Sequence, residues 1–459
     1  MPDFDLAVVG SGPGGYVAAI HAARQGARVA IVEQKDWGGT CLNVGCIPTK
    51  ALIQSAEVLK AVRGAAEFGV RVGEPAVDWP SMQARKDRVV SGLRLGVQSL
   101  LKANGVELVS GRGRLRPGAV VGVDGRDLGA TSVLLAPGSL AARPPFPGAD
   151  LALDSDGVLT IERLPRTLCV IGGGVVGMEF ASCFDLLGVK VVVVEMLDQL
   201  LAPLDPDMAR RFQQLMTRRG IEFHLSARVE KVERAGGAYR VSLEGRRLEA
   251  DLVLVTTGRR PATDGIGLEE SGVERDRAAI KVDEHMRTSA ANVYAIGDAT
   301  AISMLAHTAS YQGEVAVGNA LGSKSISADY RAVPACIYTD PEIAYVGVSE
   351  AQARASGQEV KVGTFPFTAL GRALVLGETA GMVKVVADRE GYLLGVSIVG
   401  PRATDLIAEA TLALSQGLTA AELAHTVHAH PTLPEALFEA ALDVDGQAVH
   451  VAPKKQTLK

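Results

Sequence analysis

The chain has 459 residues, enough for about three domains, and 47% of them are hydrophobic, so it can fill several cores. A formal net charge of −5 without a basic cluster excludes nucleic acid as an expected partner. Its apolar runs are far shorter than the roughly 20 residues of a membrane span, so no membrane insertion is expected.

The N-terminus does not resemble a secretory signal, because Asp3 and Asp5 interrupt it and a strand-like segment begins at once. The five cysteines are odd in number and do not form the pattern of a secreted disulfide framework. We therefore expect a cytoplasmic protein, in which any disulfide would be catalytic.

The first 33 residues carry the elements of a dinucleotide-binding unit. A strand, a glycine-rich turn, a helix and a second strand are predicted at residues 5–9, 10–15, 16–25 and 26–32. Gly10, Gly12 and Gly15 have the spacing that lets the backbone approach a pyrophosphate at the helix N-terminus. Glu33, which ends the second strand, is placed to bond the ribose hydroxyls.

Two cysteines follow this unit, at positions 41 and 46. On an ideal helix, residues five apart are separated by about 7.5 Å along the axis, whereas a disulfide needs Cα atoms within about 4.4–6.8 Å. A bond between Cys41 and Cys46 would therefore need a distorted backbone, which Gly45 and Pro48 permit. A strained, easily reduced disulfide suits a redox role, and two unrelated packed thiols are the alternative.

The same nucleotide-binding arrangement recurs 162 residues later, since Gly172 follows Gly10 and Glu195 follows Glu33 at that interval. A strand, a turn, a helix and a strand are predicted at residues 167–171, 172–177, 178–187 and 189–194, with glycines at Gly172, Gly174 and Gly177. A carboxylate at Glu195 accepts bonds from a free ribose 2′-hydroxyl and repels a 2′-phosphate, so this second unit favours NAD over NADP.

Other elements lie between and after the two units. A helix at 78–101, short strands over 106–135 and 240–255, and turns at 136–139 and 257–261 are predicted. A later strand ends at Asp298, which by itself is a loop residue or cap and beside a flavin can bind a ribityl hydroxyl. From about residue 334 the pattern becomes α+β, with strands at 382–387 and 393–399 and helices at 403–416 and 435–442. This segment is typical of a packing or dimer-interface domain.

Five motifs, in this order, resemble the dihydrolipoamide dehydrogenase family of pyridine nucleotide–disulfide oxidoreductases: GGTCLNVGCIPTK, GGGVVGMEF, AIGDA, MLAH and HAHPTLPEA. The resemblance covers the whole chain and implies an α/β fold with two Rossmann-like dinucleotide-binding domains, for FAD and NAD, and a C-terminal α+β dimerisation domain. We predict the first part of the FAD domain at 1–142, the NAD domain at 143–265, a central second part of the FAD domain at 266–333 and the interface domain at 334–459.

The family's functional residues can be carried over to matching positions. FAD contacts are implied at Gly10, Gly12, Gly15, Glu33, Thr40, Lys50, Gly113, Gly138, Asp298, Leu305, Ala306 and His307. NAD contacts are implied at Gly172, Gly174, Gly177, Glu195 and Gly258, and no metal is expected. Cys41 and Cys46 would form the redox disulfide, with Cys41 exchanging with substrate and Cys46 facing the flavin. Lys50 would lie near the flavin N5 with Glu179 as its acidic partner.

The implied activity is oxidation of protein-bound dihydrolipoamide with reduction of NAD⁺, as the E3 component of 2-oxo acid dehydrogenase complexes or of glycine cleavage. His430 would take the thiol proton and Glu435 would orient it, both from the other subunit of a homodimer. Because no lipoyl domain precedes Asp3, we expect the lipoyl group to arrive in trans on an E2 or H-protein.

Each implied role has an alternative. Thr432 and Glu435 have the spacing of a capping box, His430 can be a loop histidine, and Lys50 can be a solvated helix residue. His428 is expected to be structural, as are three cysteines in core segments, Cys169, Cys183 and Cys336.

Two other functions compete: a flavin disulfide reductase acting on glutathione or mercuric ion, and a non-catalytic component that docks into a complex. Glu195 disfavours the first, and the intact cysteine and histidine set disfavours the second.

Overall fold

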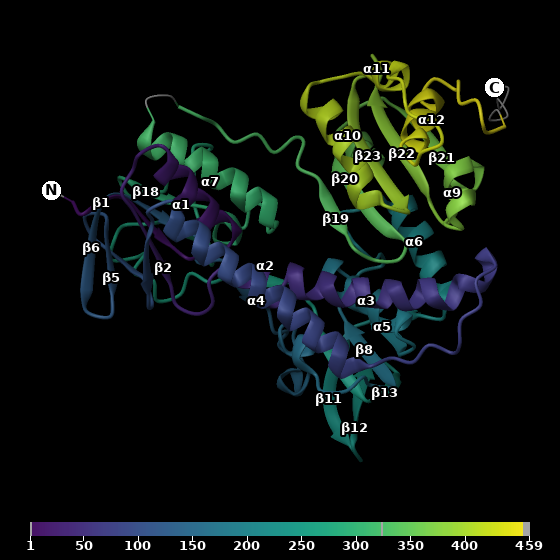
Figure 1. Ribbon diagram of the computed structural model, residues 1–459, viewed down its shortest axis with the longest axis horizontal. Coiled ribbons are helices and arrows are strands. Elements are labelled where there is room, and N and C mark those ends of the chain that lie inside the picture. Colours follow the sequence, from purple (N-terminus) through teal and green to yellow (C-terminus); the bar gives the residue numbers. More distant parts are fainter. Residues whose placement is uncertain (1, 323–324, 453–459) are drawn as a thin grey trace.

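The computed structural model of the protein describes residues 2–322 and 325–452. Three bodies, each built on a β-sheet, make up the molecule, and two long helices, α3 (Cys46–Gly64) and α4 (Trp79–Ala103), lie across its middle (Figure 1). Within the described residues, no helix combines the length and the apolar character needed to cross a membrane.

The first body holds a seven-stranded sheet with β1 between β2 and β6. Its strands are β1 (Phe4–Val9), β2 (Val29–Glu33), β3 (Glu107–Ser110), β4 (Arg114–Arg116), β5 (Val120–Val123), β6 (Arg126–Leu135) and β18 (Val293–Ala295). Neighbouring strands are parallel, except that β5 is antiparallel to both of its neighbours, β4 and β6. Helices α1 (Pro13–Arg24) and α7 (Ala306–Leu321) pack against each other over this sheet (Figure 1). The sheet therefore joins segments that lie far apart in the sequence.

The second body repeats the parallel arrangement in the order β10-β9-β8-β14. Its parallel strands are β8 (Thr167–Ile171), β9 (Lys190–Val194), β10 (Glu222–His224) and β14 (Leu252–Val255), with helices α5 (Val175–Leu186) and α6 (Pro206–Arg219). An antiparallel sheet of β11 (Val229–Ala235), β12 (Ala238–Leu243) and β13 (Arg246–Ala250) completes it.

The third body is a five-stranded antiparallel sheet in the order β19-β20-β23-β22-β21. Its strands are β19 (Ala335–Ile337), β20 (Glu342–Gly347), β21 (Val360–Pro366), β22 (Met382–Asp388) and β23 (Leu393–Gly400). Its helices are α8 (Glu350–Ala355), α9 (Gly371–Leu376), α10 (Ala403–Ser415), α11 (Ala420–His425) and α12 (Glu435–Asp443).

Short elements connect the bodies. The strands β7 (Ser139–Ala141) and β15 (Arg259–Pro261) pair antiparallel where the chain passes between the first two bodies. The remaining short elements are α2 (Gly39–Val44), β16 (Arg275–Asp276), β17 (Ala279–Ile280) and five 3₁₀ turns, η1 (Ala65–Phe68), η2 (Ala149–Leu151), η3 (Gly157–Thr160), η4 (Gly297–Thr300) and η5 (Phe367–Ala369).

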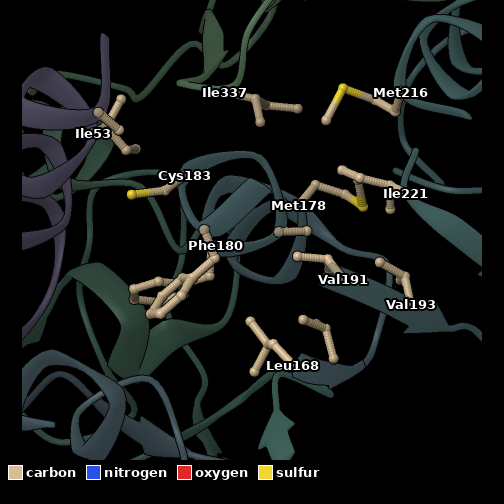
Figure 2. Close-up of a cluster of buried hydrophobic side chains, with 14 of the residues drawn as sticks. Ile53, Leu168, Met178, Phe180, Cys183, Val191, Val193, Met216, Ile221 and Ile337 are labelled. Atoms are coloured by element: carbon tan, nitrogen blue, oxygen red, sulfur yellow. The ribbon is translucent and has the colours of Figure 1, made fainter. Parts of the chain in front are cut away.

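One apolar core ties α3 and the third body to the second body (Figure 2). Ile53 of α3 and Ile337 of β19 lie in the same buried cluster as Phe180 of α5. Full burial of a side chain of this size contributes about 1.5–3 kcal/mol. The cluster therefore holds the helix that begins at Cys46 in a fixed place between the second and third bodies.

The predicted α/β architecture is found, with differences at the element ends. Both helices that follow the glycine turns begin three residues earlier than predicted, at Pro13 and Val175. Proline suits a first helical turn, because its missing N–H has no helical partner there. The strand predicted from residue 26 starts at Val29, because Gly26 has φ +87° and still belongs to the turn. The residue limits of the domains remain predictions.

Candidate active site

The turn between β1 and α1 has two glycines that no other residue can replace. A Cβ on Gly10 would lie 2.1 Å from the Ala136 oxygen, and one on Gly15 would lie 1.9 Å from the Gly10 oxygen. By contrast, no atom lies within 4 Å of a Cβ built on Gly12. Gly10 and Gly15 therefore close the turn, and Gly12 leaves open space beside the N-terminus of α1, where a pyrophosphate fits.

The turn between β8 and α5 repeats this geometry. A Cβ on Gly172 would lie 2.6 Å from the Thr256 oxygen, and one on Gly177 would lie 2.0 Å from the Gly172 oxygen. Gly174, like Gly12, faces open space within 4 Å. Both units thus present a helix N-terminus with a cradle that a side chain would fill.

The acid at the end of each second strand is bonded to its own glycine turn. In the first unit, Glu33 accepts hydrogen bonds from the Ser11 backbone N–H at 2.9 Å and the Ser11 hydroxyl at 2.6 Å. In the second, Glu195 accepts one from the Gly173 N–H at 2.6 Å and one from the Leu197 N–H at 2.8 Å. Ser11 was not singled out from the sequence. Bonding of either acid to a ribose stays a prediction.

The predicted backbone distortion between the two cysteines is found at Gly45. This residue, with φ −135° and ψ −117°, ends α2 and precedes α3. A Cβ on Gly45 would lie 2.9 Å from the Thr40 oxygen and 3.0 Å from the Cys41 Cα. The helix is interrupted at this one residue, and the thiols of Cys41 and Cys46 on either side of it come within hydrogen-bonding distance of each other.

Both cysteines are free thiols in the structure, which is the reduced form of the proposed pair. The Cys41 thiol donates a hydrogen bond to the Cys46 sulfur, which raises the pKa of Cys41 and lowers the pKa of Cys46. Burial raises the pKa of Cys46 and the charge of Lys50 lowers it, and the net shift is downward. Cys46 is also the first residue of α3, and a helix N-terminus favours a thiolate.

Lys50 and Glu179 form the ion pair that the sequence predicts. The Lys50 Nζ lies 2.7 Å from both carboxylate oxygens of Glu179, whose side chain is only 4% exposed. The Tyr338 N–H donates to Glu179 at 3.0 Å, and Lys50 lies 4.7 Å from the centre of the Tyr338 ring. A buried carboxylate of this kind is stable only when its partners are all present. The position of Lys50 relative to a flavin stays a prediction.

Two tyrosines of this site were not identified from the sequence. Tyr338 follows β19 and reaches the Lys50–Glu179 pair from the third body. Tyr16 lies in the first turn of α1, where burial raises its pKa and the charge of a Cys41 thiolate raises it further. The position of Tyr16 directly after the Gly15 turn was the only sequence signal.

Asp298 is neither a free loop residue nor a helix cap. It lies in η4 and accepts a hydrogen bond of 2.5 Å from the Ser139 hydroxyl. Arg259 donates to the same hydroxyl oxygen at 2.6 Å and lies 3.9 Å from Asp298. The paired strands β7 and β15 therefore orient this acid.

The remaining predicted cofactor residues lie near the same elements. A Cβ on Gly113 would approach Val9 to 3.0 Å, whereas Gly138 and Gly258 have positive φ and open space around them. Leu305 precedes α7, Ala306 begins it, and Thr40 lies in α2. The His307 ring is 2.8 Å from the Pro334 oxygen. Their contacts with FAD or NAD stay predictions.

His430 and Glu435 are bonded to each other. The His430 Nδ1 lies 2.9 Å from one carboxylate oxygen of Glu435, and the Thr432 N–H donates to the other at 2.7 Å. Burial raises the pKa of the Glu435 carboxyl, but these two hydrogen bonds lower it, and the net shift of the pKa is downward. The Thr432 hydroxyl donates to Ala429 instead of closing a capping box. The carboxylate therefore bonds the backbone just before α12 and the histidine ring at the same time, and its catalytic role stays a prediction.

The His430 side chain is 78% exposed. The residue belongs to the third body, which does not carry Cys41 and Cys46. Figure 1 shows α12 at the far side of the third body, well separated from α2. One chain therefore does not bring the His430–Glu435 pair to Cys41. His428, by contrast, is buried against Phe438 and bonded to Glu409, as expected of a structural residue.

The other three cysteines have the high pKa values of packed thiols. Burial raises the pKa of Cys169 and of Cys183 to about 12, and burial with nearby carboxylates raises that of Cys336 to about 11. They are unreactive near neutral pH, in agreement with their predicted structural role.

Known proteins match the chain over nearly its whole length. The family model described as pyridine nucleotide-disulphide oxidoreductase matches residues 4–313, and the model of that family's dimerisation domain matches residues 333–441. A dihydrolipoyl dehydrogenase from Chlamydia muridarum is 43% identical, over 99% of each chain, and one from Halobacterium salinarum is 44% identical, over 97% of each.

A solved structure gives the same result at the level of the fold. LpdA from Mycobacterium tuberculosis superimposes with a TM-score of 0.88 at 31% identity, covering 95% of this chain and 98% of that one. The predicted fold class is thus confirmed. On these matches, and with two nucleotide turns flanking a cysteine pair, the chain belongs to the pyridine nucleotide-disulphide oxidoreductase family.

Proposed function

We propose that this protein is a dihydrolipoyl dehydrogenase, which oxidises protein-bound dihydrolipoamide to lipoamide and reduces NAD⁺. The observation that carries the proposal is the Cys41–Cys46 pair, held in contact by the break at Gly45 and placed beside the Lys50–Glu179 ion pair. Full-length relatives with this name support it.

Two cofactors fit the open cradles. FAD would be held at the β1–α1 turn by the Gly12 backbone, Glu33 and Asp298, with Lys50 near the redox pair. NAD would be held at the β8–α5 turn by Gly174 and Glu195. Bound FAD supplies the redox chemistry that reoxidises the cysteine pair and passes a hydride to NAD⁺.

Thiol–disulfide exchange accounts for the use of two cysteines. The first substrate thiolate attacks the Cys41 sulfur, the Cys41–Cys46 bond breaks, and Cys46 leaves as a thiolate. Its lowered pKa makes Cys46 the better leaving group of the two. The second substrate sulfur then displaces Cys41, so that the substrate gains one S–S bond, loses two S–H bonds, and leaves both cysteines reduced.

His430 of a second copy of the chain would accept the substrate's thiol proton. Imidazole titrates near neutral pH, and with Nδ1 bonded to Glu435, Nε2 would be the ring nitrogen that accepts the proton. The high exposure of His430 and the separation of α12 from α2 support a homodimer as the active form, in line with the matched dimerisation domain. The lipoyl group would be presented by a separate carrier, an E2 or an H-protein.

A substrate comparison tests the proposal. Dihydrolipoamide, glutathione disulfide and Hg²⁺ are assayed with NAD(H) and with NADP(H), using Cys46→Ser as the control for the cysteine pair. We expect dihydrolipoamide with NAD⁺ to be turned over fastest and the Cys46→Ser variant to be inactive. Preference for glutathione disulfide or Hg²⁺ would assign another reductase, and no turnover of any substrate would favour a docking role.

A further inference from the structure

A buried lysine joins the second and third bodies outside the cysteine site. Lys384 of β22 has a side chain that is 2% exposed, and its Nζ lies 3.1 Å from Asp205, 2.9 Å from Asp207 and 2.8 Å from Glu350. Asp205 and Asp207 stand at the start of α6 in the second body, whereas Glu350 begins α8 in the third. The Glu350 N–H also donates to Asp205 at 2.8 Å.

These contacts make the junction dependent on Lys384. Asp205 is only 4% exposed, so its charge has little access to water. Removing the lysine would leave the buried Asp205 carboxylate beside Asp207 without its cation. Among the described residues, Arg354 pairs with Glu350 only, and breaking a buried pair is more costly than losing an exposed one. The start of α6 would then have to move away from Glu350.

The start of α6 is connected to the second nucleotide turn by the short segment 195–204, in which Leu200, Leu201 and Leu204 are buried. The Leu201 N–H donates to the Gly173 oxygen at 3.0 Å, and Leu204, which precedes Asp205, donates to the Leu201 oxygen at 2.8 Å. The Gly173 N–H is held by Glu195. The N–H and the oxygen of Gly173 are thus both bonded by the segment 195–204, and the next residue, Asp205, is paired with Lys384.

The first nucleotide turn is held differently. There, the Ser11 hydroxyl bridges Glu33 at 2.6 Å and the Gly38 N–H at 3.0 Å, so the turn is fixed by residues of its own body. The corresponding position in the second unit is Gly173, which has no hydroxyl. The second turn therefore lacks this side-chain bridge and depends on Glu195 and on the segment that follows it.

We propose that Lys384 is a positioning residue for the NAD site: through Asp205 and the segment 195–204, it holds Glu195 and the Gly172–Gly174 turn in the geometry that binds the nucleotide. This inference rests on the proposed binding of NAD at the second unit. It assigns the third body a role in nucleotide binding in addition to dimerisation.

The test measures NAD⁺ affinity and the dithiol reaction separately, on the FAD-containing protein. Calorimetry gives the Kd for NAD⁺, and stopped-flow mixing with dihydrolipoamide in the absence of NAD⁺ gives the rate of enzyme reduction. For Lys384→Met we expect the Kd to rise about tenfold or more, since small displacements of a binding group have effects of this size. The rate of reduction by dihydrolipoamide should stay within about twofold, because the cysteine pair lies on α2 and α3, outside the junction.

Two further variants keep the result unambiguous. Lys361 lies on the neighbouring strand β21 and forms an exposed ion pair with Asp445. Its substitution, Lys361→Met, should change neither the Kd nor the rate of reduction. Asp207 is a half-exposed member of the junction, so Asp207→Asn should also raise the Kd for NAD⁺, by a smaller factor than Lys384→Met. If Lys384→Met does not fold, the Kd of the Asp207→Asn variant tests the inference. An unchanged Kd, or an equal loss of the dithiol reaction, would overturn the inference. Failure of the unsubstituted protein to bind NAD⁺ would overturn the proposed function as well.

Discussion

Gly45 passes so close to Cys41 that a Cβ on the glycine would lie 3.0 Å from the Cys41 Cα. This close approach replaces the straight helix that would have kept the two cysteines apart. The hydrogen bond between the thiols, and with it the lowered pKa of Cys46, depends on this backbone contact. The chemistry of the pair is therefore encoded by the residue between them as much as by the sulfur atoms.

Substitution of Gly45 by alanine should disrupt the pair. The added methyl group would clash with two backbone atoms, the Thr40 oxygen at 2.9 Å and the Cys41 Cα at 3.0 Å. We expect a loss of about 1–3 kcal/mol in the free energy of unfolding and slower closure of the disulfide, measured by counting free thiols after mild oxidation. Gly64→Ala, at the open end of α3, is the matched control and should behave as the unsubstituted protein.

Cys46→Ser should abolish turnover of dihydrolipoamide while the flavin stays bound. A hydroxyl cannot form the disulfide, whereas the nucleotide turn at Gly10–Gly15 does not involve this side chain. Steady-state assays and the visible absorbance of the purified protein measure the two properties. Cys336→Ser, at a thiol whose pKa is raised to about 11, should retain activity, and activity in the Cys46 variant would refute its assigned role.

The reduced pair should react with iodoacetamide at a lower pH than an ordinary cysteine. Because the pKa of Cys46 is lowered from 9.0 to about 7, its thiolate is present above that pH and is lost by protonation below it. Alkylation rates should therefore rise through pH 7. The charge of Lys50 contributes to the shift, so Lys50→Met should move the midpoint upward.

A matched lysine checks the pH experiment. Lys60 lies on the same helix and is paired with Asp340, away from the thiols. Lys60→Met should leave the alkylation midpoint unchanged. A midpoint near pH 9 in the unsubstituted protein, or equal shifts in both lysine variants, would contradict the electrostatic account of Cys46.

His430→Gln should lower the rate of dihydrolipoamide oxidation by about 10²-fold or more, because the substrate would lose its proton acceptor. Glu435→Gln should have a smaller effect, since one oxygen then has to serve both His430 and Thr432. His425→Gln, at an exposed histidine bonded to Ala421 of its own helix, is the control. Unchanged turnover in the His430 variant would exclude it as the base.

Local sequence signals predicted much of the fold but fewer of the contacts. The glycine turns could be recognised because Gly15 and Gly177 pack against the backbone of Gly10 and Gly172, which lie in the same short turns. The bonds from Glu33 to Ser11 and from Glu179 to Tyr338 could not, because they join residues 22 and 159 positions apart whose distance only the packed structure determines. Glu435 shows a third case: its carboxylate has one oxygen for the Thr432 N–H and one for the His430 ring, so the local spacing and the contact with the histidine do not exclude each other.

Tyr338 has a consequence for protein engineering. Its N–H and its ring come from the third body, yet both contact the ion pair beside the redox cysteines. A truncated chain ending before β19 would expose Glu179 and remove one face of the environment of Lys50. The first two bodies therefore cannot be transplanted as a self-sufficient module: any chimaera that exchanges the C-terminal body has to bring a matched residue at position 338 with it.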